Sequence, residues 1–283
     1  MRAALPPTAF AVAALLALAG CGPTGSDASP IDPRIDAAGT DLATDPDVEV
    51  LADLEYGAAD GTPLLLDACL PPERDPSAAA GPGILVVHGG NWREGRKDSV
   101  GWRAVCTWLR APEQAARFGI DPERLGVFGG SAGGNLAALL GTTGRGALTQ
   151  GSRVAAVAEL SGPIDLTGVA ITDDFIPIQL EYLGCASFAN CPTAAPASPG
   201  THVDPTDPPF LVAHSTAEKI PLAQSDRFVE RLRAAGIDVE YYVAEGTLHS
   251  IALLDDDLKS RILAFFARTL GPSAPPLVPD AAR

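Results

Sequence analysis

The chain has 283 residues and a formal net charge of −15, from 20 basic and 35 acidic residues. Apolar residues make up 46% of it, which is enough to bury a core, so an entirely disordered chain is excluded. Nucleic-acid binding needs a cationic surface and often aromatic stacking, whereas this chain is strongly acidic and only 6% aromatic. We therefore expect a folded protein that has no nucleic-acid partner.

The first 20 residues have the pattern of an export signal. A single base, Arg2, precedes an apolar run over residues 9–19, which is too short to span a bilayer. The run ends in Leu-Ala-Gly-Cys21, which resembles a bacterial lipobox, whose cysteine is lipidated and becomes the mature N-terminus. We expect export and attachment to the outer face of a bacterial membrane by lipid on Cys21 alone. An ordinary cleaved signal with a chance cysteine is the alternative.

Composition divides the remaining chain into three parts. Residues 21–47 are acidic, rich in Pro, Gly and Ala, and without periodicity, which is typical of a solvated tether. Residues 48–270 alternate apolar and amphipathic stretches and form the expected domain, with a cap-like insertion at 162–208. Residues 271–283 are rich in proline and read as a flexible tail.

The cysteine count agrees with export. Apart from Cys21 the chain has four cysteines and no C-x-x-C pair, so a zinc or thioredoxin-like site is not expected. Cys185 and Cys191 enclose a short loop and are expected to pair, which leaves Cys69 to pair with Cys106. Four buried free thiols are the alternative.

The alternating stretches of the domain predict an α/β fold. Asp60-Gly61 separates the first two apolar runs and indicates a hairpin. Later runs are continuous and apolar, as in strands buried on both faces of a parallel sheet. The expected strands are 48–56, 62–70, 83–87, 125–128, 154–160, 210–213 and 239–243, and the expected helices are 99–110, 112–118, 135–140, 221–235 and 256–269. A mostly parallel sheet with helices on both faces gathers its chemistry at the carboxyl ends of the strands.

Ser131 lies in a G-x-S-x-G pattern between an expected strand and an expected helix, which is the context of a nucleophile elbow. The turn is so tight that its neighbours must be small, as Gly130 and Ala132 are. The N–H groups at the start of the following helix favour a developing oxyanion. A dinucleotide-binding loop is excluded because Ser131 stands where G-x-G-x-x-G requires glycine.

A histidine and a carboxylate complete a candidate triad. His249 follows the last expected strand, where a base could reach Ser131, and an imidazole with a reference pKa of about 6.5 suits that role. The base needs an acid to hold its tautomer. Glu218 lies in the loop after the preceding strand, so the chain order is nucleophile, acid, histidine. Asp226, inside an expected helix, and Asp165 are rival acids.

A third segment, His-Gly-Gly-Asn-Trp at residues 88–92, follows an expected buried strand. Its bare glycines allow backbone N–H groups to point at a ligand, as in the second half of an oxyanion hole, and a mere turn is the alternative. We expect His88 to shape this loop and not to transfer protons.

Residues 60–270 resemble the α/β-hydrolase superfamily, in its bacterial esterase branch related to hormone-sensitive lipase. The resemblance implies Ser131 as nucleophile, His249 as base and Glu218 where the family usually has aspartate. It also implies that the N–H groups of Gly90, Asn91 and Ala132 form the oxyanion hole. Asn91 replaces the third glycine of many members, as in the formamidase-like branch. The segments that carry the resemblance are 88–92, 129–137, 161–166, 221–225 and His249.

One family element is missing from the sequence. The family places helix, strand and helix between the oxyanion loop and the elbow, but no apolar run lies between Trp92 and Leu125. We expect the sheet to lack one internal strand there. Residues 62–70 would lose their usual neighbour and be tied to the domain mainly through Cys69 and Cys106.

The sequence therefore predicts a serine carboxylesterase that acts on small acyl esters through an acyl-enzyme, with no metal or cofactor. A formamidase-type amidase with the same machinery is one alternative. A surface lipoprotein whose activity is impaired by the missing strand is the other.

Overall fold

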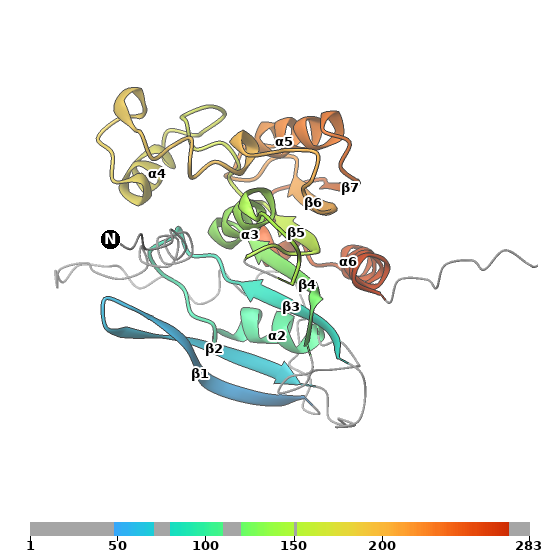
Figure 1. Cartoon of the computed structure of the whole chain (residues 1–283). Helices are drawn as coiled ribbons and strands as arrows, with labels where there is room; N and C mark the ends of the chain where they lie inside the picture. Colours follow the sequence, from blue (N-terminus) through green and yellow to red (C-terminus); the bar gives the residue numbers. More distant parts are fainter. Residues whose placement is uncertain (1–47, 71–79, 110–119, 150–151, 272–283) are drawn as a thin grey trace, which may run out of the picture.

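The computed structural model describes residues 48–70, 80–109, 120–149 and 152–271. The described chain folds as strands alternating with helices, which confirms the expected α/β class (Figure 1). The strands are β1 (Glu49–Ala59), β2 (Thr62–Leu70), β3 (Gly81–Val87), β4 (Ile120–Gly130), β5 (Ala156–Leu160), β6 (Phe210–Ser215) and β7 (Val239–Ala244). The helices are α2 (Val100–Trp108), α3 (Ala132–Thr143), α4 (Ile176–Leu183), α5 (Ala223–Ala234) and α6 (Asp256–Leu270).

Strands β3 to β7 form a five-stranded sheet in their chain order, and every neighbouring pair is parallel. In the middle of the sheet, Val127 lies beside Val157, Val157 beside Phe210, and Phe210 beside Val239. Val127, Val157 and Phe210 are fully buried, as the continuous apolar runs predict. The carboxyl ends of all five strands meet at one edge, where the candidate site residues follow.

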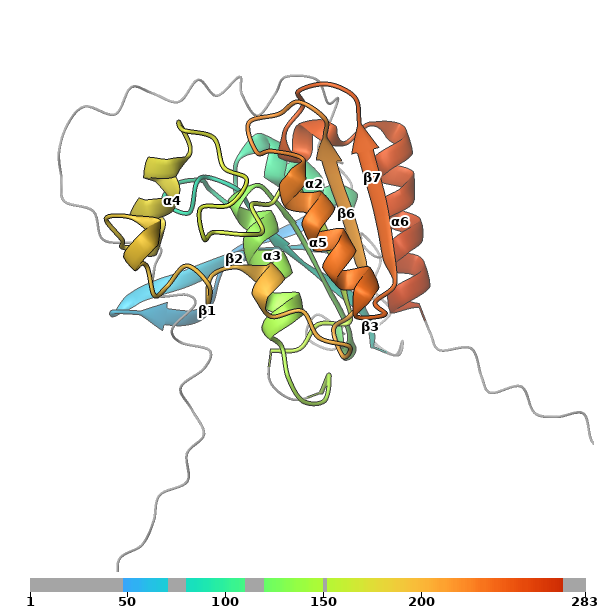
Figure 2. The ribbon, with the colours of Figure 1, turned by 90° about the horizontal axis from the view of Figure 1, so that it is seen from above.

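Two helices cover each face of this sheet. Helices α2 and α6 pack on one face through side chains such as Val105 and Phe265, and α3 and α5 pack on the other through Ala138 and Phe228. Figure 2 shows α5 and α6 on opposite sides of β6 and β7. The central strands β5 and β6 are therefore buried along their whole length, and the open strand ends are the place where polar side chains gather.

The hairpin β1–β2 is a separate two-stranded sheet, and among the described residues it makes no ladder with β3. No described strand lies between β3 and β4. β3 is therefore the edge of the five-stranded sheet, with the hairpin next to α2 (Figure 1). This is the arrangement expected from a missing internal strand.

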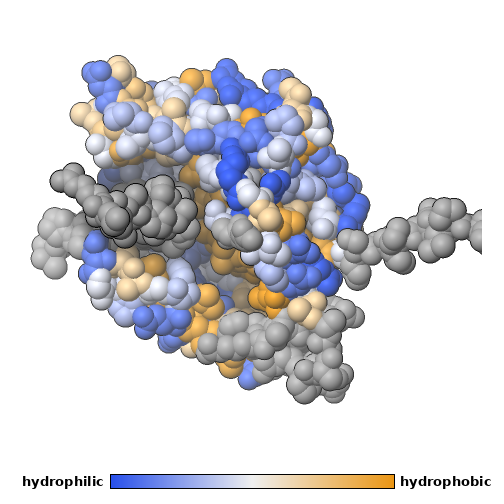
Figure 3. All heavy atoms as spheres, in the orientation of Figure 1, coloured by the Kyte–Doolittle hydropathy of each residue, from blue (hydrophilic) through white to orange (hydrophobic). Residues whose placement is uncertain are grey.

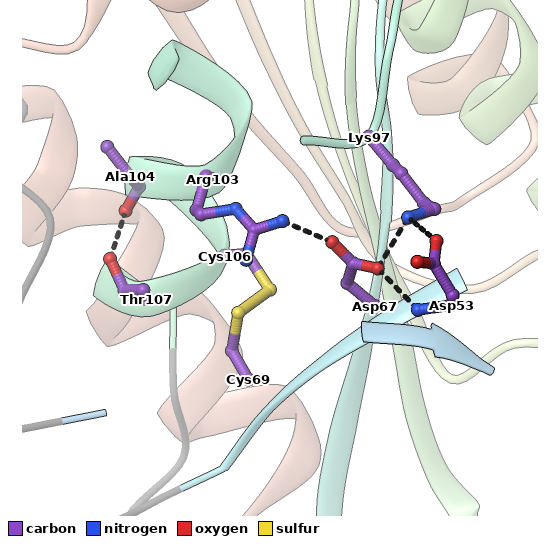
Figure 4. The surroundings of a disulfide bond; sticks show 8 residues. All are labelled: Asp53, Asp67, Cys69, Lys97, Arg103, Ala104, Cys106 and Thr107. Atoms are coloured by element: carbon purple, nitrogen blue, oxygen red, sulfur yellow. Dashed lines mark hydrogen bonds and ion pairs between the residues drawn. A yellow bond between two sulfur atoms is a disulfide. The ribbon is translucent and has the colours of Figure 1, made fainter. Parts of the chain in front are cut away.

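Two kinds of contact hold the hairpin to the domain (Figure 4). The sulfur atoms of Cys69 on β2 and Cys106 on α2 lie at bonding distance, 2.18 Å. Next to them, the buried Asp67 carboxylate is 2.6 Å from Lys97 Nζ and 2.5 Å from Arg103 Nη2. Burial opposes the ionisation of Asp67, but the hydrogen bonds and charges of these cations outweigh it and lower the pKa of the carboxyl.

The missing strand leaves apolar side chains in contact with water. Leu65 on β2, Leu85 on β3 and Ile120 on β4 are each 41–42% exposed. Figure 3 shows apolar residues around the hollow between the hairpin and the sheet. Within the described residues β3 has a ladder on one side only, and such an edge with an exposed leucine favours pairing with another chain.

Some boundaries differ from the sequence-based expectation. β4 begins at Ile120, earlier than the expected 125, because Ile120 pairs with Gly81 ahead of the apolar core of the strand. Helix α4 lies in the 162–208 segment and was not expected as a helix, although Pro177 sits in its first turn, where proline is tolerated. The expected helix 112–118 lies outside the described residues. In the part of the chain that is described, no helix has the length and hydropathy to cross a bilayer.

Candidate active site

Ser131 stands at the turn between β4 and α3 with φ of 57°, a left-handed conformation that is unusual for serine. Its backbone N–H donates to the carbonyl of Leu160 at the end of β5, 2.8 Å away. A Cβ on Gly129 would collide with the carbonyl of Gly133, and one on Gly133 with the carbonyl of Val87. The small residues around the serine are therefore a steric requirement of the elbow.

The oxyanion loop, residues 88–95, lies directly against the elbow. A Cβ on Gly89 would lie 3.0 Å from the carbonyl oxygen of Gly130 and 3.2 Å from the Ser131 Cβ, so a larger residue would crowd the elbow. Gly90, Asn91 and Trp92 follow with φ of 134°, 55° and 59°. Positive φ is uncommon for residues other than glycine, so the backbone of this loop is strained, as is found at functional sites. The predicted oxyanion donors, the N–H groups of Gly90, Asn91 and Ala132, belong to this loop and to the first turn of α3.

Trp92 fixes this strained loop from two sides. Its indole Nε1–H donates to Asn135 Oδ1 at 3.1 Å, and Asn135 is fully buried in α3. The Asn135 amide in turn donates to the carbonyl of Pro163 at 2.9 Å. The Trp92 ring also stacks on Tyr182 of α4, with centroids 4.4 Å apart and planes 10° apart. The 162–208 segment is thus anchored to the oxyanion loop.

Glu218 and His249 meet at the same edge of the sheet. Glu218 Oε2 and His249 Nδ1 form a hydrogen bond, and the glutamate side chain is fully buried. The other ring nitrogen of His249, Nε2, is buried and has no partner among the described residues. Burial lowers the pKa of His249 below 6.5, although the hydrogen bond and charge of Glu218 oppose this shift. The lowered pKa favours the neutral imidazole, the state in which Nε2 can accept a proton.

Hydrogen bonds between loops fix the position of His249. Ser215 Oγ at the end of β6 donates to the carbonyl of Leu248 at 2.6 Å. On the other side, the N–H of Ser250 donates to Ser161 Oγ at 3.0 Å, and a Cβ on Gly130 would collide with Ser250 Oγ. The histidine loop is therefore held between the acid loop, the end of β5 and the residue that precedes Ser131.

The rival acids have other partners. Asp226 lies in α5 and accepts a hydrogen bond from the Tyr241 hydroxyl at 2.9 Å. Asp165 accepts from the N–H of Thr167 at 3.0 Å within its own turn. Of the three carboxylates considered, only Glu218 is bonded to His249 within the described residues.

A cavity of about 280 Å³ lies beside the oxyanion loop, and Ala132, the residue after Ser131, is part of its wall. It lies between the oxyanion loop, the first turn of α3 and helix α4, and its walls include Gly89, Trp92, Arg93, Ala132, Leu136 and Tyr182. His88 is also in the wall, with Nδ1 2.8 Å from the carbonyl of Gly89. The described residues contain no group of three or more His, Cys, Asp or Glu side chains arranged to hold a metal ion.

The second cysteine pair lies within the 162–208 segment. The sulfur atoms of Cys185 and Cys191 are 2.14 Å apart and close the loop after α4. Both expected pairings therefore have their sulfur atoms at bonding distance. Cys21 lies outside the described residues.

Sequence reasoning gave no role to four residues that shape the site, namely Asn135, Ser161, His214 and Ser215. Asn135 and Ser161 belong to segments that resemble the family, but their motifs do not tell which backbone groups they bond. Their partners lie 28 and 89 residues away in the chain, at Pro163 and Ser250. Only the folded arrangement of the strand ends brings these groups together.

Comparisons with known proteins agree with this architecture. The BD-FAE family model matches residues 102–232, a span that includes Ser131 and Glu218 and ends before His249. Esterase LipQ of Mycobacterium tuberculosis is 30% identical, over 75% of this chain and 60% of that protein. Ethyl acetate hydrolase of Pseudomonas putida is 28% identical, over 73% of this chain and 76% of that protein.

The chain spans 60% and 55% of the length of two mycobacterial relatives that it matches, LipQ and LipM. Among solved structures, a truncated carbohydrate esterase from gut microbiota has a TM-score of 0.64 at 20% identity, covering 83% of this chain and 99% of that one. At this identity the likeness concerns the fold. By sequence the chain is similar to esterases, and its fold is that of the esterase structures it resembles.

Proposed function

We propose that this protein is a serine carboxylesterase in which Ser131 is the nucleophile, His249 the base and Glu218 the acid. The observation that carries the proposal is the hydrogen bond between buried Glu218 and His249 at the strand edge where Ser131 stands in an elbow. The names of the relatives, esterase LipQ and ethyl acetate hydrolase, support an ester substrate.

In the proposed reaction His249 Nε2 takes the proton of Ser131 while the serine oxygen attacks the ester carbonyl. The N–H groups of Gly90, Asn91 and Ala132 stabilise the negative oxygen that forms. Collapse of this intermediate transfers the proton from His249 to the departing alcohol and leaves an acyl group on Ser131. Water, deprotonated by His249 in the same way, then releases the acid.

The cavity favours small acyl groups. Its volume of about 280 Å³ lies just below the range of small-molecule pockets, about 300–1,000 Å³. An activated amide is the second candidate substrate, because Asn91 gives the loop the H-G-G-x-W form of the formamidase-like branch. The exposed edge at β3 keeps a third possibility open, a hydrolase of impaired activity.

The decisive experiment is fluorophosphonate labelling of purified wild type, Ser131→Ala and Ser198→Ala. Ser198 is a fully buried serine outside the site, so its replacement is a matched control. We expect label on wild type and control and none on Ser131→Ala, with the same pattern in hydrolysis of p-nitrophenyl acetate. If neither labelling nor hydrolysis depends on Ser131, the impaired hydrolase is the better description.

We propose further that the protein is exported and anchored by lipid on Cys21. The support is the apolar run over residues 9–19, which ends in Leu-Ala-Gly-Cys21. Cys21→Ser should move the protein from the membrane fraction to the soluble fraction without changing hydrolysis. Retention of the variant in the membrane would point to a different attachment.

A further inference from the structure

A second imidazole lies against the proposed catalytic acid. His214, near the end of β6, is fully buried. Its Nε2 is 2.8 Å from the carbonyl oxygen of Ile220 and 3.1 Å from Glu218 Oε1. Its Nδ1 is 2.8 Å from the Ser225 hydroxyl. The Glu218 carboxylate therefore lies between two histidines, with Oε2 toward His249 and Oε1 toward His214.

The partners of His214 assign its proton. A carbonyl oxygen can only accept a hydrogen bond, so the contact with Ile220 requires that Nε2 carries hydrogen. The same N–H faces Glu218 Oε1, which is buried and makes no hydrogen bond of regular geometry within the described residues. His214 thus gives Oε1 an electrostatic contact while it holds the Ile220 end of the acid loop.

We propose that His214 is a positioning residue that holds the Glu218 carboxylate in the orientation needed by His249. This inference rests on the proposed triad. Glutamate has one more rotatable bond than the aspartate usual in the family, and a buried carboxylate oxygen without a nearby donor is costly. The Nε2–H of His214 restrains both the loop and the free oxygen, so that Oε2 stays on His249 Nδ1.

Two amide substitutions separate this role from simple packing. In His214→Gln the amide nitrogen reaches about the position of Nε2, so a donor toward Ile220 and Glu218 is retained. In His214→Asn the shorter amide reaches only the position of Nδ1 and retains the contact with Ser225. Ser225→Ala is the matched control, because it removes the partner on the opposite side of the same ring.

The first measurement is hydrolysis of p-nitrophenyl acetate. We expect His214→Asn to lower kcat by about 10- to 100-fold with KM changed less than about twofold, as for a misplaced catalytic group. His214→Gln should recover most of the loss, and Ser225→Ala should keep most of the wild-type kcat. Melting temperatures establish that all variants are folded.

The second measurement does not depend on turnover. The chain has only four histidines, so the downfield ring N–H resonances in a proton spectrum of ¹⁵N-histidine-labelled protein can be assigned with a His249→Gln variant. The resonance of His249 Nδ1–H should be present in wild type, His214→Gln and Ser225→Ala. In His214→Asn it should move upfield or disappear through exchange with solvent.

An unchanged His249 resonance in His214→Asn would overturn the inference. Equal losses in His214→Asn, His214→Gln and Ser225→Ala would also overturn it, since they would indicate packing alone. If wild type shows no Ser131-dependent hydrolysis but the resonance pattern is as expected, the proposed function fails and the positioning role stands.

Discussion

The backbone N–H of Ser250 donates to the side-chain oxygen of Ser161, 3.0 Å away, across 89 residues of chain. Both serines are in the left-handed region, with φ of 54° for Ser161 and 59° for Ser250. Ser161 follows β5 and Ser250 follows His249, so this bond fixes the histidine loop to the strand next to the elbow. The strain in both residues is offset by contacts that a looser arrangement would lose.

Ser161→Ala should therefore impair hydrolysis more than it impairs folding. It leaves the Ser250 N–H without its acceptor, which costs about 1–3 kcal/mol for a buried group, and it frees the backbone next to His249. We expect a fall of about tenfold or more in kcat with KM nearly unchanged. Ser198→Ala is the matched control, because Ser198 lies away from the site. Its Oγ likewise accepts a hydrogen bond from a backbone N–H, that of Leu166, at a distance of 2.8 Å. Equal kcat values for the two variants would contradict this role.

Glu218→Gln should lower kcat strongly while the protein stays folded. The amide has the shape of the carboxylate but no charge, so it can no longer stabilise the imidazolium of His249 or fix its tautomer. We expect a loss of about 10³-fold or more, by analogy with the acid of serine protease triads. Asp226→Asn is the control, since the Asp226 carboxylate accepts from Tyr241. A larger loss for Asp226→Asn than for Glu218→Gln would show that the acid is wrongly assigned.

Glu159, the penultimate residue of β5, should make stability depend on pH. Its side chain is fully buried, Oε2 accepts from the N–H of Gly162 at 2.9 Å, and Oε1 has no partner among the described residues. Burial raises the pKa of Glu159 to about 8, so the folded protein holds a proton that the unfolded chain releases near pH 4.5. The protonated Glu159 therefore contributes its full free energy of folding below pH 4.5, and this contribution is lost as the pH rises toward 8.

Glu159→Gln removes this titration and keeps an acceptor for Gly162. Its gain in melting temperature over wild type should be small at pH 5 and reach about 3 °C or more at pH 8, since 1 kcal/mol moves the Tm of a domain this size by about 2–4 °C. Glu230→Gln, at an exposed site on α5, is the control and should give no pH-dependent gain. Parallel melting curves for wild type and Glu159→Gln across this range would contradict the prediction.

The sheet was predictable because its signals are local. Continuous apolar runs mark strands such as β5 and β6, which are buried on both faces, and the fold confirms them. Helix α4 was not predicted, because the helix is short and its apolar face packs on Trp92 and not on the sheet. Tertiary contact decides its conformation, and the sequence around Pro177 does not reveal that contact.

The candidate site was predictable only in part. Ser131 has a motif, and chain order points to Glu218, whose bond to His249 the structure contains. His214 has no such signal, because a histidine inside an apolar run is usually a core residue, and the motif around Asn135 does not tell which groups its side chain bonds. Their importance comes from hydrogen bonds to Ile220 and Trp92, which depend on how loops fold over the strand ends.

The hairpin β1–β2 has no ladder to the five-stranded sheet among the described residues. Its backbone hydrogen bonds can open without opening the main sheet, since side chains tie it to the domain: the Cys69–Cys106 pair, and the ion pairs of Asp53 and Asp67 with Lys97 and of Asp67 with Arg103. Amide hydrogen exchange should therefore be faster in β2 than in the β4 strand of the main sheet. Equal protection of the two strands would show that the hairpin is an integral part of the sheet.

Replacing each cysteine pair by serine tests what holds the hairpin. The Cys69–Cys106 pair encloses 37 residues and Cys185–Cys191 only 6, so loop closure alone predicts losses of about 4 and about 2 kcal/mol. We expect the Cys69/Cys106 double variant to lose most of the remaining protection of β2 and to associate through the exposed β3 edge, as light scattering would detect. The Cys185/Cys191 double variant should leave β2 unchanged, because that pair lies after α4. Unaltered exchange of β2 in the first variant would mean that Asp67, with Lys97 and Arg103, is sufficient to hold the hairpin.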